Sequence, residues 1–520
     1  MRWRQVLALV YLMGLGSASV GQTYNVPLNN VVYYGFEADL YRKGCEFHTS
    51  MKPYRMDDLN RSIRYDSLRT LNHHHSKFSK SFIGRKIVSR SLLQLDSSRF
   101  TIAADLVFNF ELGRDFVGKY NYLVNTKGAR LFGRIGKRVS YYSAIFETQA
   151  TFMPYMVREI KARNVVPGFG RAKDFPFNRG LWQAFKSVPN GYDFALVQGY
   201  VSYSATRWLN VQLGHDRFMI GDGYRSLFLS DAGFNYPFVK AEASFWKMRY
   251  TMLWNSLQDI SIPVPFESGF VKKWGSFHYL SYNATPWLQA GLFGAVVWGR
   301  GKSNGVGGLN LRFRPFNRTI IYGQLLIDDL AVAEMFEGSG HMGQKVGLQL
   351  GTKVHAPFRA KGLMLQMEYN TVRPYTYASS DRYINYGHYN QALAHPLGAN
   401  FHELVGILHY RFKDIAFVYK LNYAVIGRDT SATSFGADIN KPTTEAALGQ
   451  WSYGNTTGQG IGSTVLMQDI NLSYTVNRVS NFYIILGLQH RQETTAVATE
   501  KNVYVYFALR TMLSNLYNDY

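Results

Sequence analysis

The segment GHDRFMIGDGYRSLFLSD, residues 214–231, sets a Gly-Asp-Gly sequence among charged side chains, as phosphate-binding loops do. A loop of the P-loop type also needs a Lys-Ser/Thr pair at the start of a helix, where the lysine and backbone amides surround the phosphate. Here Tyr224 and Arg225 follow the glycines, and no such pair or helix-forming run comes after them. The segment therefore does not predict a phosphate loop, and its charged and aromatic side chains become candidates for another binding site.

Motifs of zinc proteases and serine hydrolases are incomplete in this sequence. HELVG begins at His402 like a zinc-protease helix, but Gly406 stands where the second histidine is needed and the segment alternates like a strand. No Gly-X-Ser-X-Gly motif occurs, and EGSGH at Glu337 lacks its spacing. Lipases and acyltransferases embedded in barrels exist, so missing motifs do not exclude an enzyme. We predict a non-enzymatic protein without cofactor or metal.

Two other short segments carry residues suited to binding. Asp328 and Asp329 end the apolar stretch YGQLLIDDL, where paired carboxylates bind a cation or sugar hydroxyls, or simply pair with nearby arginines. AHPLGANFHE contains His395 and ends at Glu403, and its proline and glycine indicate a tight turn before a strand. Both segments remain candidates for binding and for purely structural roles.

Residues 151–192 form a strongly basic link in which cations stand beside aromatic rings. Cations suit uronate or phosphate groups, and flat rings pack on the apolar faces of sugars. A basic surface loop touching lipopolysaccharide phosphates would have the same composition, so both interpretations stay open. The cations are Arg158, Lys161, Arg163, Arg171, Lys173 and Arg179, and the rings are Phe169, Phe175, Phe177 and Trp182.

The element that must position these residues is a long β-strand repeated along the chain. In RFTIAADLVFNFELG, from residue 99, apolar residues alternate with the others over thirteen positions, and Asp105 and Glu111 fall on the second face. This period of two lasts longer than in globular strands and is long enough to cross a bilayer at a tilt. The pattern predicts one lipid-facing and one lumen-facing side.

Similar segments recur to the end of the chain and predict an antiparallel barrel of about eighteen strands. The candidate strands are 99–113, 126–137, 139–150, 193–205, 207–219, 235–245, 247–258, 274–285, 287–299, 305–315, 318–327, 344–355, 361–373, 401–412, 414–427, 464–476, 480–492 and 501–512.

The links between these strands predict how the barrel is oriented. Links after even-numbered strands are short, whereas most links after odd-numbered strands are long. Alternating short and long links along an even number of strands are typical of an outer-membrane barrel, with periplasmic turns, extended surface loops and both chain ends in the periplasm. The long links are 151–192, 219–234, 259–273, 328–343, 374–400 and 428–463.

The two ends of the chain and the aromatic residues agree with a barrel. Residues 1–21 have the basic start, short apolar run and small residues of a secretory signal peptide. The last strand closes on Tyr520, an aromatic end that resembles the terminal recognition signal of outer-membrane barrels. Aromatic residues near turns suit the girdles at membrane interfaces. The aromatic residues in question are Trp208, Trp246, Trp287 and Tyr322.

Residues 22–98 differ from the barrel segment 99–520, because they are polar and basic without sustained alternation. We predict a periplasmic extension or plug with one or two short helices near residues 56–71. The three histidines at 73–75 suit metal binding or plain solvent exposure, and adjacent histidines on a flexible segment more often sit in solvent. Cys45 is the one cysteine, so it cannot form an intramolecular disulfide.

Composition points to anionic partners. The chain has 57 Lys and Arg against 35 Asp and Glu, a net charge of +22, with 16% aromatic and only 18% charged residues. A strongly basic protein attracts anions, and an exported chain seldom meets nucleic acid. Anionic polysaccharide, lipopolysaccharide and outer-membrane lipids are therefore the expected partners, along with other outer-membrane or surface proteins.

The run FMIGDGYRSLFLSDAGFNYPF resembles the Gly-rich, Ser-Leu-rich segment of the Wzi family of capsule-assembly outer-membrane proteins, and LLIDDL and HPLGANFHE resemble later signatures of that family. The resemblance covers three short segments, together with strand number and length. It implies an eighteen-stranded barrel with a periplasmic helical part, acting as a lectin that anchors surface polysaccharide. The sequence departs from the pattern at IGDGYRS, where the family is expected to have a tryptophan-rich glycine stretch, which puts the ligand in doubt.

Three functions follow as hypotheses. The first is a barrel of the Gram-negative outer membrane that binds and organises anionic surface polysaccharide. The alternatives are a scaffold subunit of a gliding-motility or protein-secretion assembly, as for some similar barrels, and a substrate-selective porin. The predicted ligand-binding residues are Phe169, Arg171, Lys173, Arg217, Asp222, Tyr224, Arg225, Asp231, Asp328, Asp329 and Glu403.

Overall fold

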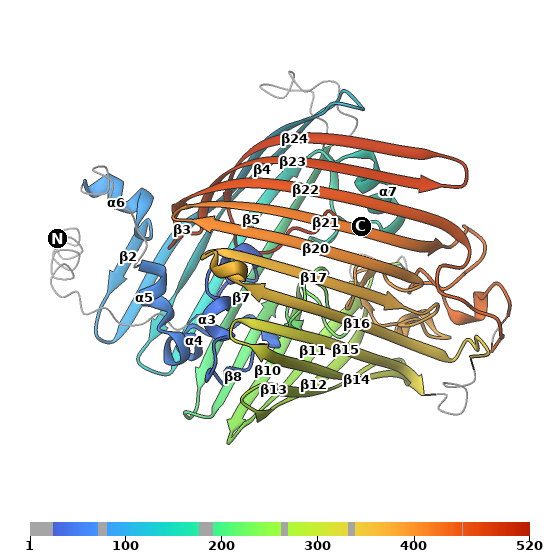
Figure 1. Ribbon diagram of the computed structural model, residues 1–520, viewed down its shortest axis with the longest axis horizontal. Coiled ribbons are helices and arrows are strands. Elements are labelled where there is room, and N and C mark those ends of the chain that lie inside the picture. Colours follow the sequence, from blue (N-terminus) through green and yellow to red (C-terminus); the bar gives the residue numbers. More distant parts are fainter. Residues whose placement is uncertain are drawn as a thin grey trace.

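A closed antiparallel barrel of 18 strands forms the body of the computed structural model, which describes residues 24–70, 81–175, 191–261, 269–330, 338–449 and 451–519 (Figure 1). The barrel strands are β3 (Phe100–Asp115), β4 (Asn121–Ile135), β5 (Val139–Ala150), β7 (Gly191–Ser204), β8 (Leu209–Asp216), β10 (Tyr236–Phe245), β11 (Met248–Asp259), β12 (Val271–Thr285), β13 (Leu288–Gly299), β14 (Lys302–Phe316), β15 (Thr319–Leu330), β16 (Gln344–His355), β17 (Leu363–Val372), β20 (Phe401–Phe412), β21 (Ile415–Arg428), β22 (Ile461–Asn477), β23 (Phe482–Thr495) and β24 (Thr499–Thr511).

Each of the predicted strands is confirmed, and the largest shift is the start of β4 at Asn121 in place of residue 126. Alternation also places the two faces as predicted: on β3, Asp105 is 4% exposed and points inward, whereas its neighbour Leu106 is 57% exposed on the outer wall. In the described part of the chain, no helix is long and apolar enough to span a membrane.

The barrel closes between its first and last strands over a short seam. β24 pairs with β3 from Tyr504 opposite Asp115 to Arg510 opposite Asn109. Beyond the end of β24, the short strand β2 (Leu93–Asp96) pairs with the same edge of β3. Next to this seam, the buried Asp105 is bound by Arg130 at 2.7 Å and by the backbone amide of Leu92 at 2.9 Å. The seam is thus completed by a segment outside the barrel strands.

The links between strands confirm that one end of the barrel has short turns and the other has mostly long links. Long links follow β5, β8, β11, β15, β17 and β21. Three links at the long-link end are nevertheless short, at residues 116–120, 300–301 and 496–498, so the alternation is not strict.

Residues 24–70 lie against the inward side chains of the barrel. This segment contains the helices α2 (Asn30–Tyr34), α3 (Glu37–Leu40), α4 (Met56–Ile63) and α5 (Tyr65–Thr70), and α6 (Phe82–Val88) follows it. Contacts with the wall are polar as well as apolar: the amide of Asn25 donates to the Tyr200 hydroxyl at 2.7 Å. The Glu37 carboxylate meets the Lys353 ammonium at 3.2 Å, with both side chains nearly inaccessible.

The chain after β24 also turns into the lumen. β24 ends at Thr511, and Ser514 forms a parallel bridge with Leu28, so the first and last described segments lie side by side. The C-terminal end accordingly lies within the barrel outline in Figure 1. The last strand ends at Thr511, within one residue of its predicted end, and Tyr520 lies outside the described residues.

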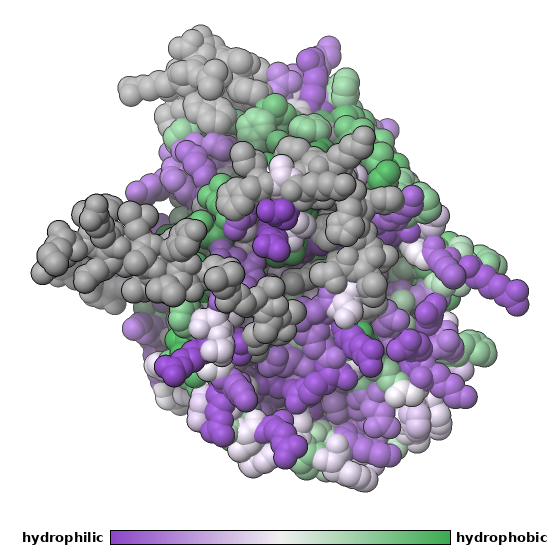
Figure 2. All heavy atoms as spheres, turned by 90° about the vertical axis from the view of Figure 1, so that its left-hand side faces the viewer, coloured by the Kyte–Doolittle hydropathy of each residue, from purple (hydrophilic) through white to green (hydrophobic). Residues whose placement is uncertain are grey.

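Exposed aromatic residues stand beside basic ones at the short-turn end. Trp208, Trp246 and Trp287 are exposed there as predicted, but Tyr322 was misplaced, since it points inward and is 2% exposed. The side of the molecule that carries α4, α5 and α6 is hydrophilic over much of its surface (Figure 2). The paired residues are Arg207 and Trp208, Trp246 and Lys247, Phe316 and Arg318, Phe358 and Arg359, and Phe412 and Lys413.

The apolar outer wall indicates contact with lipid, and a charged substitution in the middle of a strand tests this prediction. Leu292 is 60% exposed on β13, and Val497 is exposed in the hairpin before β24. We expect Leu292→Arg to lower the free energy of unfolding in phospholipid vesicles by about 2–4 kcal/mol, because an arginine on the lipid face loses its hydration. Val497→Arg should change it by less than about 0.5 kcal/mol. Equal effects of the two substitutions in urea unfolding would contradict a lipid-facing wall.

Candidate functional site

The link between β8 and β10, residues 217–235, folds into the lumen and is anchored by its apolar centre. Leu227, Phe228 and Leu229 are fully buried, and the Phe228 ring stacks on Phe293 of the wall with centroids 4.6 Å apart. Gly221 has φ 149°, in the region that favours glycine, and its backbone amide donates to Ser50 in the N-terminal segment. The predicted constrained loop is therefore an internal loop, joined to both wall and N-terminal segment.

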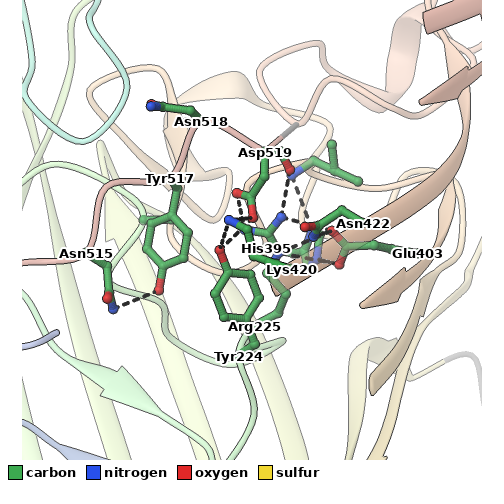
Figure 3. Close-up of polar contacts among 12 residues, drawn as sticks. Tyr224, Arg225, His395, Glu403, Lys420, Asn422, Asn515, Tyr517, Asn518 and Asp519 are labelled. Atoms are coloured by element: carbon green, nitrogen blue, oxygen red, sulfur yellow. Dashed lines mark hydrogen bonds and ion pairs between the residues drawn. The ribbon is translucent and has the colours of Figure 1, made fainter. Parts of the chain in front are cut away.

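Arg225 is the centre of a buried ion network carried by this loop (Figure 3). Its guanidinium meets the Glu403 carboxylate of β20 at 2.9 Å and the Asp519 carboxylate of the tail at 3.2 Å. Arg225 also donates to the Asp519 carbonyl at 2.8 Å. All three side chains are 1% exposed or less. The network joins three segments that are far apart in the sequence.

The carboxylates around Arg225 have further partners, as buried charges require. Glu403 is bound by His395 at 2.8 Å and by the Asn370 amide at 3.0 Å. Glu368 of β17 accepts from the backbone amides of both Tyr224 and Arg225, at 2.7 and 3.0 Å. These contacts fix the direction in which the Arg225 side chain leaves the loop.

The tail, residues 512–519, is held by the same loop and by β21. The Asp519 carboxylate accepts from the Tyr224 hydroxyl at 2.5 Å and from the Lys420 ammonium at 2.8 Å. At the other end of the tail, Tyr517 and Asn515 donate to Asp231 at 2.8 and 2.9 Å. Asp519 therefore occupies a site formed by Arg225, Lys420 and Tyr224, which we name the Asp519 seat.

The charges around the buried acids of these segments favour their ionised forms. Burial alone raises the pKa of Asp519, but Arg225 and Lys420 more than offset it, so the pKa lies below its ordinary value of 3.8. Burial likewise raises the pKa of Asp222, and Arg312 and Lys52 bring it below 3.8. Both carboxylates are consequently charged at neutral pH.

Asp222 makes a second contact between the internal loop and the N-terminal segment. It accepts hydrogen bonds from the hydroxyls of Thr49 and of Ser50, the latter at 2.8 Å. Arg312 of β14 donates to the Thr49 hydroxyl, which links this contact to the wall. The predicted residues Asp222, Tyr224, Arg225 and Asp231 thus all contact other parts of the chain.

The other predicted ligand residues lie apart from this network. Arg217 is buried and donates to the carbonyls of Gly168 and Gly233. Phe169 packs on Phe194, with ring centroids 4.9 Å apart. Asp328 accepts from the amide of Tyr377 at 2.5 Å.

Arg171 and Lys173 are exposed at the long-link end, where the Arg171 guanidinium lies 5.6 Å from the Phe270 ring. The side chain of Asp329 and residues 73–75 and 176–190 lie outside the described residues, so Arg179, Phe177 and Trp182 of the basic link are not placed.

Beside the tail lies a lumen cavity of about 270 Å³, bounded by the inward faces of β3, β4, β5 and β21 to β24. Tyr504 and Tyr506 stack on its wall with centroids 5.2 Å apart. Tyr224 and Lys420 of the Asp519 seat also line it. Its other ionisable wall residues are Glu111, Asp469 and Arg510.

Of the predicted residues, Tyr224, Arg225 and Glu403 lie in this network, whereas Lys420, Asp469, Asp519 and the stacked tyrosines were not predicted. Lys420 and Asp469 occupy inward positions of neighbouring strands, so a charge inside the alternation was a usable signal. Within the described residues, no group of three or more His, Cys, Asp or Glu residues could hold a metal ion. The arrangement can bind a carboxylate through two cations and a phenol, next to aromatic rings.

No protein-family model and no curated protein matches this chain. Among solved structures, it is similar to Wzi, an outer-membrane protein involved in group 1 capsule assembly in Escherichia coli and described as a carbohydrate-binding β-barrel. The TM-score is 0.58 at 12% identity, covering 95% of this chain and 100% of that one. OprD and OpdK of Pseudomonas aeruginosa match at 10% and 11% identity over 78% of this chain and 94% and 98% of theirs, with TM-scores of 0.43 and 0.42. The chain shares the Wzi fold.

The buried network makes Arg225 a stability determinant. Arg225→Met keeps much of the side-chain length but leaves Glu403 and Asp519 without their shared cation. We expect the free energy of unfolding to fall by about 3–5 kcal/mol, because a buried carboxylate without its partner is costly. The matched variant Arg171→Met should lose less than about 1 kcal/mol, as an exposed cation–aromatic contact is worth little. Equal denaturant midpoints for the two variants would contradict this role.

Proposed function

We propose that this protein is an outer-membrane barrel of a Gram-negative bacterium that binds and organises anionic surface polysaccharide without converting it chemically. The observation that carries the proposal is the lumen cavity, which is lined both by the stacked rings of Tyr504 and Tyr506 and by Lys420, a partner of the Asp519 carboxylate. Flat rings suit pyranose faces, and paired cations suit acidic substituents. The similarity to the carbohydrate-binding barrel Wzi agrees with this choice.

Placement in the outer membrane is supported by the apolar outer wall and by the aromatic and basic residues at the short turns. The short turns would face the periplasm and the long links the outside, so the first barrel strand would begin and the last would end on the periplasmic side. Residues 1–21 would serve as the signal peptide, and residues 22–98 as the periplasmic extension or plug of the barrel 99–520. The protein would meet lipopolysaccharide and outer-membrane lipids along its wall.

The long-link end supplies a first contact for the polymer. Arg171 and Lys173 are exposed there, and α7 (Pro154–Arg163) carries Arg158, which is half exposed. Arg158 is bound by Glu493 and Glu500, whereas the guanidinium of the exposed Arg171 lies over the Phe270 ring. An acidic chain would therefore meet Arg171 and Lys173 before it reached the lumen.

An open porin is a weaker proposal. The N-terminal segment, the internal loop and the tail all occupy the lumen and are bound to its wall by buried hydrogen bonds and ion pairs. Moving them would expose charges that are now compensated. A scaffold for gliding or secretion would use the same long-link end of the barrel. Deletion of the gene distinguishes this function from polysaccharide binding.

Deletion of the gene in its native host tests the proposal. We expect polysaccharide to be secreted but no longer attached to cells, because attachment needs the barrel and synthesis does not. The wild-type gene should restore attachment, and Arg171→Gln/Lys173→Gln should restore it only in part. The measurement is cell-bound against released polysaccharide, together with glycan that co-purifies with the barrel in mild detergent.

Each alternative predicts a different result. Unchanged cell-bound polysaccharide with loss of surface-protein display would overturn the proposal in favour of a scaffold. Stepwise ion currents through the intact chain in planar bilayers would overturn it in favour of a porin.

A further inference from the structure

Asp519 sits in the lumen as a bound carboxylate would. Its side chain is fully buried and receives the Lys420 ammonium at 2.8 Å, the Tyr224 hydroxyl at 2.5 Å and the Arg225 guanidinium at 3.2 Å. These partners come from β21 and from the internal loop, and neither element is adjacent to the tail in sequence. The chain therefore supplies its own anion to a site assembled by other segments.

This seat opens onto the lumen cavity. Tyr224 and Lys420 contribute to both, and Leu516 and Asn518 of the tail line the cavity as well. Asn518 is exposed, and Leu516 is half-buried, although Tyr517 and Asp519 on either side of Asn518 are buried. The end of the tail thus forms part of the cavity wall, and its removal would enlarge the cavity at the point where the cations lie.

The tail supplies one of the acids that surround the two cations of the seat. Arg225 and Lys420 both meet Asp519, and Glu403 meets Arg225. Glu368 and Asp469 are further carboxylates close to this site. The Nη1 atom of Arg225 and the Oδ1 atom of Asp519 face each other at 3.2 Å but have no hydrogen-bond partner within the described residues. Without Asp519, the Arg225 guanidinium and the Lys420 ammonium would lose the carboxylate that they share, and another carboxylate could take its place.

We propose that residues 516–519 are an internal ligand that an acidic sugar displaces, and that the carboxylate of a uronate takes the place of Asp519 between Arg225 and Lys420. This inference rests on the proposed function and names both the chemical class of the ligand and its site. The sugar ring would then lie in the cavity against Tyr504 and Tyr506. The cavity volume of about 270 Å³ is near the lower end of ligand pockets and grows when the tail leaves.

The probes are digalacturonate and its methyl ester, which has the same shape without charge. A tail that fills the seat about nine-tenths of the time lowers the apparent affinity for the acid about tenfold. We therefore expect Asp519→Asn, and a chain that ends at Asn515, to bind digalacturonate about tenfold more tightly than the full chain in titration calorimetry. The methyl ester should bind the full chain and both variants with equal affinity. Asp96→Asn, an exposed acid outside the lumen, should behave like the full chain.

Lys420→Met in the Asp519→Asn background is the second variant, and it should lose the gain in affinity for the acid. Thermal unfolding of every variant checks that the barrel is intact, and Asp519→Asn keeps the tail should the shortened chain fail to fold. Equal affinity of full chain and Asp519→Asn, or a gain that survives Lys420→Met, would overturn the internal-ligand proposal and place the sugar elsewhere.

Absence of digalacturonate binding in all variants would also overturn the internal-ligand proposal. The proposed function is decided separately by cell-bound polysaccharide in the deletion strain, so the two can fail independently.

Discussion

Arg225 holds a positive charge at a place where its side chain is 1% exposed, and such a charge persists in a protein interior only when it is fully compensated. Its partners are Glu403 of the wall and Asp519 of the tail, and Glu368 accepts hydrogen bonds from the backbone amides of Tyr224 and Arg225. Meeting this requirement brings the internal loop, the wall and the tail together. The interior of the barrel is arranged around that compensation.

The barrel wall explains why charge is found inside and apolar side chains outside. Period-two strands place one face toward the lumen, and an inward Lys, Glu or Asp must then find partners among segments that fill the lumen. Inward cations of the wall also find partners at the N-terminal segment. Lys353 pairs with Glu37, and Arg312 donates to Thr49, which in turn donates to Asp222. Beside the tail, these segments leave a cavity that is lined by Tyr504, Tyr506 and Lys420, where a ligand with an acid group and a flat face would fit.

The sequence was sufficient to predict the strands of the barrel wall, but not the path of the segments that fill the lumen. Strand periodicity is a local property, so all the strands were predicted, and Arg225 and Glu403 stood out as charges beside glycine- and proline-containing turns. Asp519 gave no such signal, because its partner Arg225 is 294 residues away and period two says nothing about segments that leave the sheet. For the same reason the inward path of the tail was not predicted, and Tyr322 was assigned to the outer girdle although it binds Glu368 inside.

Hydrogen exchange of the full chain in phospholipid nanodiscs, without added saccharide, tests the central claim that this buried network holds the loop and the tail in the lumen. We expect amides of residues 224–229 to be protected for as long as those of wall strands such as β11, because this loop can exchange only when compensated charges are exposed. Amides of residues 516–519 should exchange about tenfold more slowly than exposed amides, because the tail occupies its site about nine-tenths of the time. Exchange of these two segments as fast as that of the exposed 496–498 hairpin would contradict the claim.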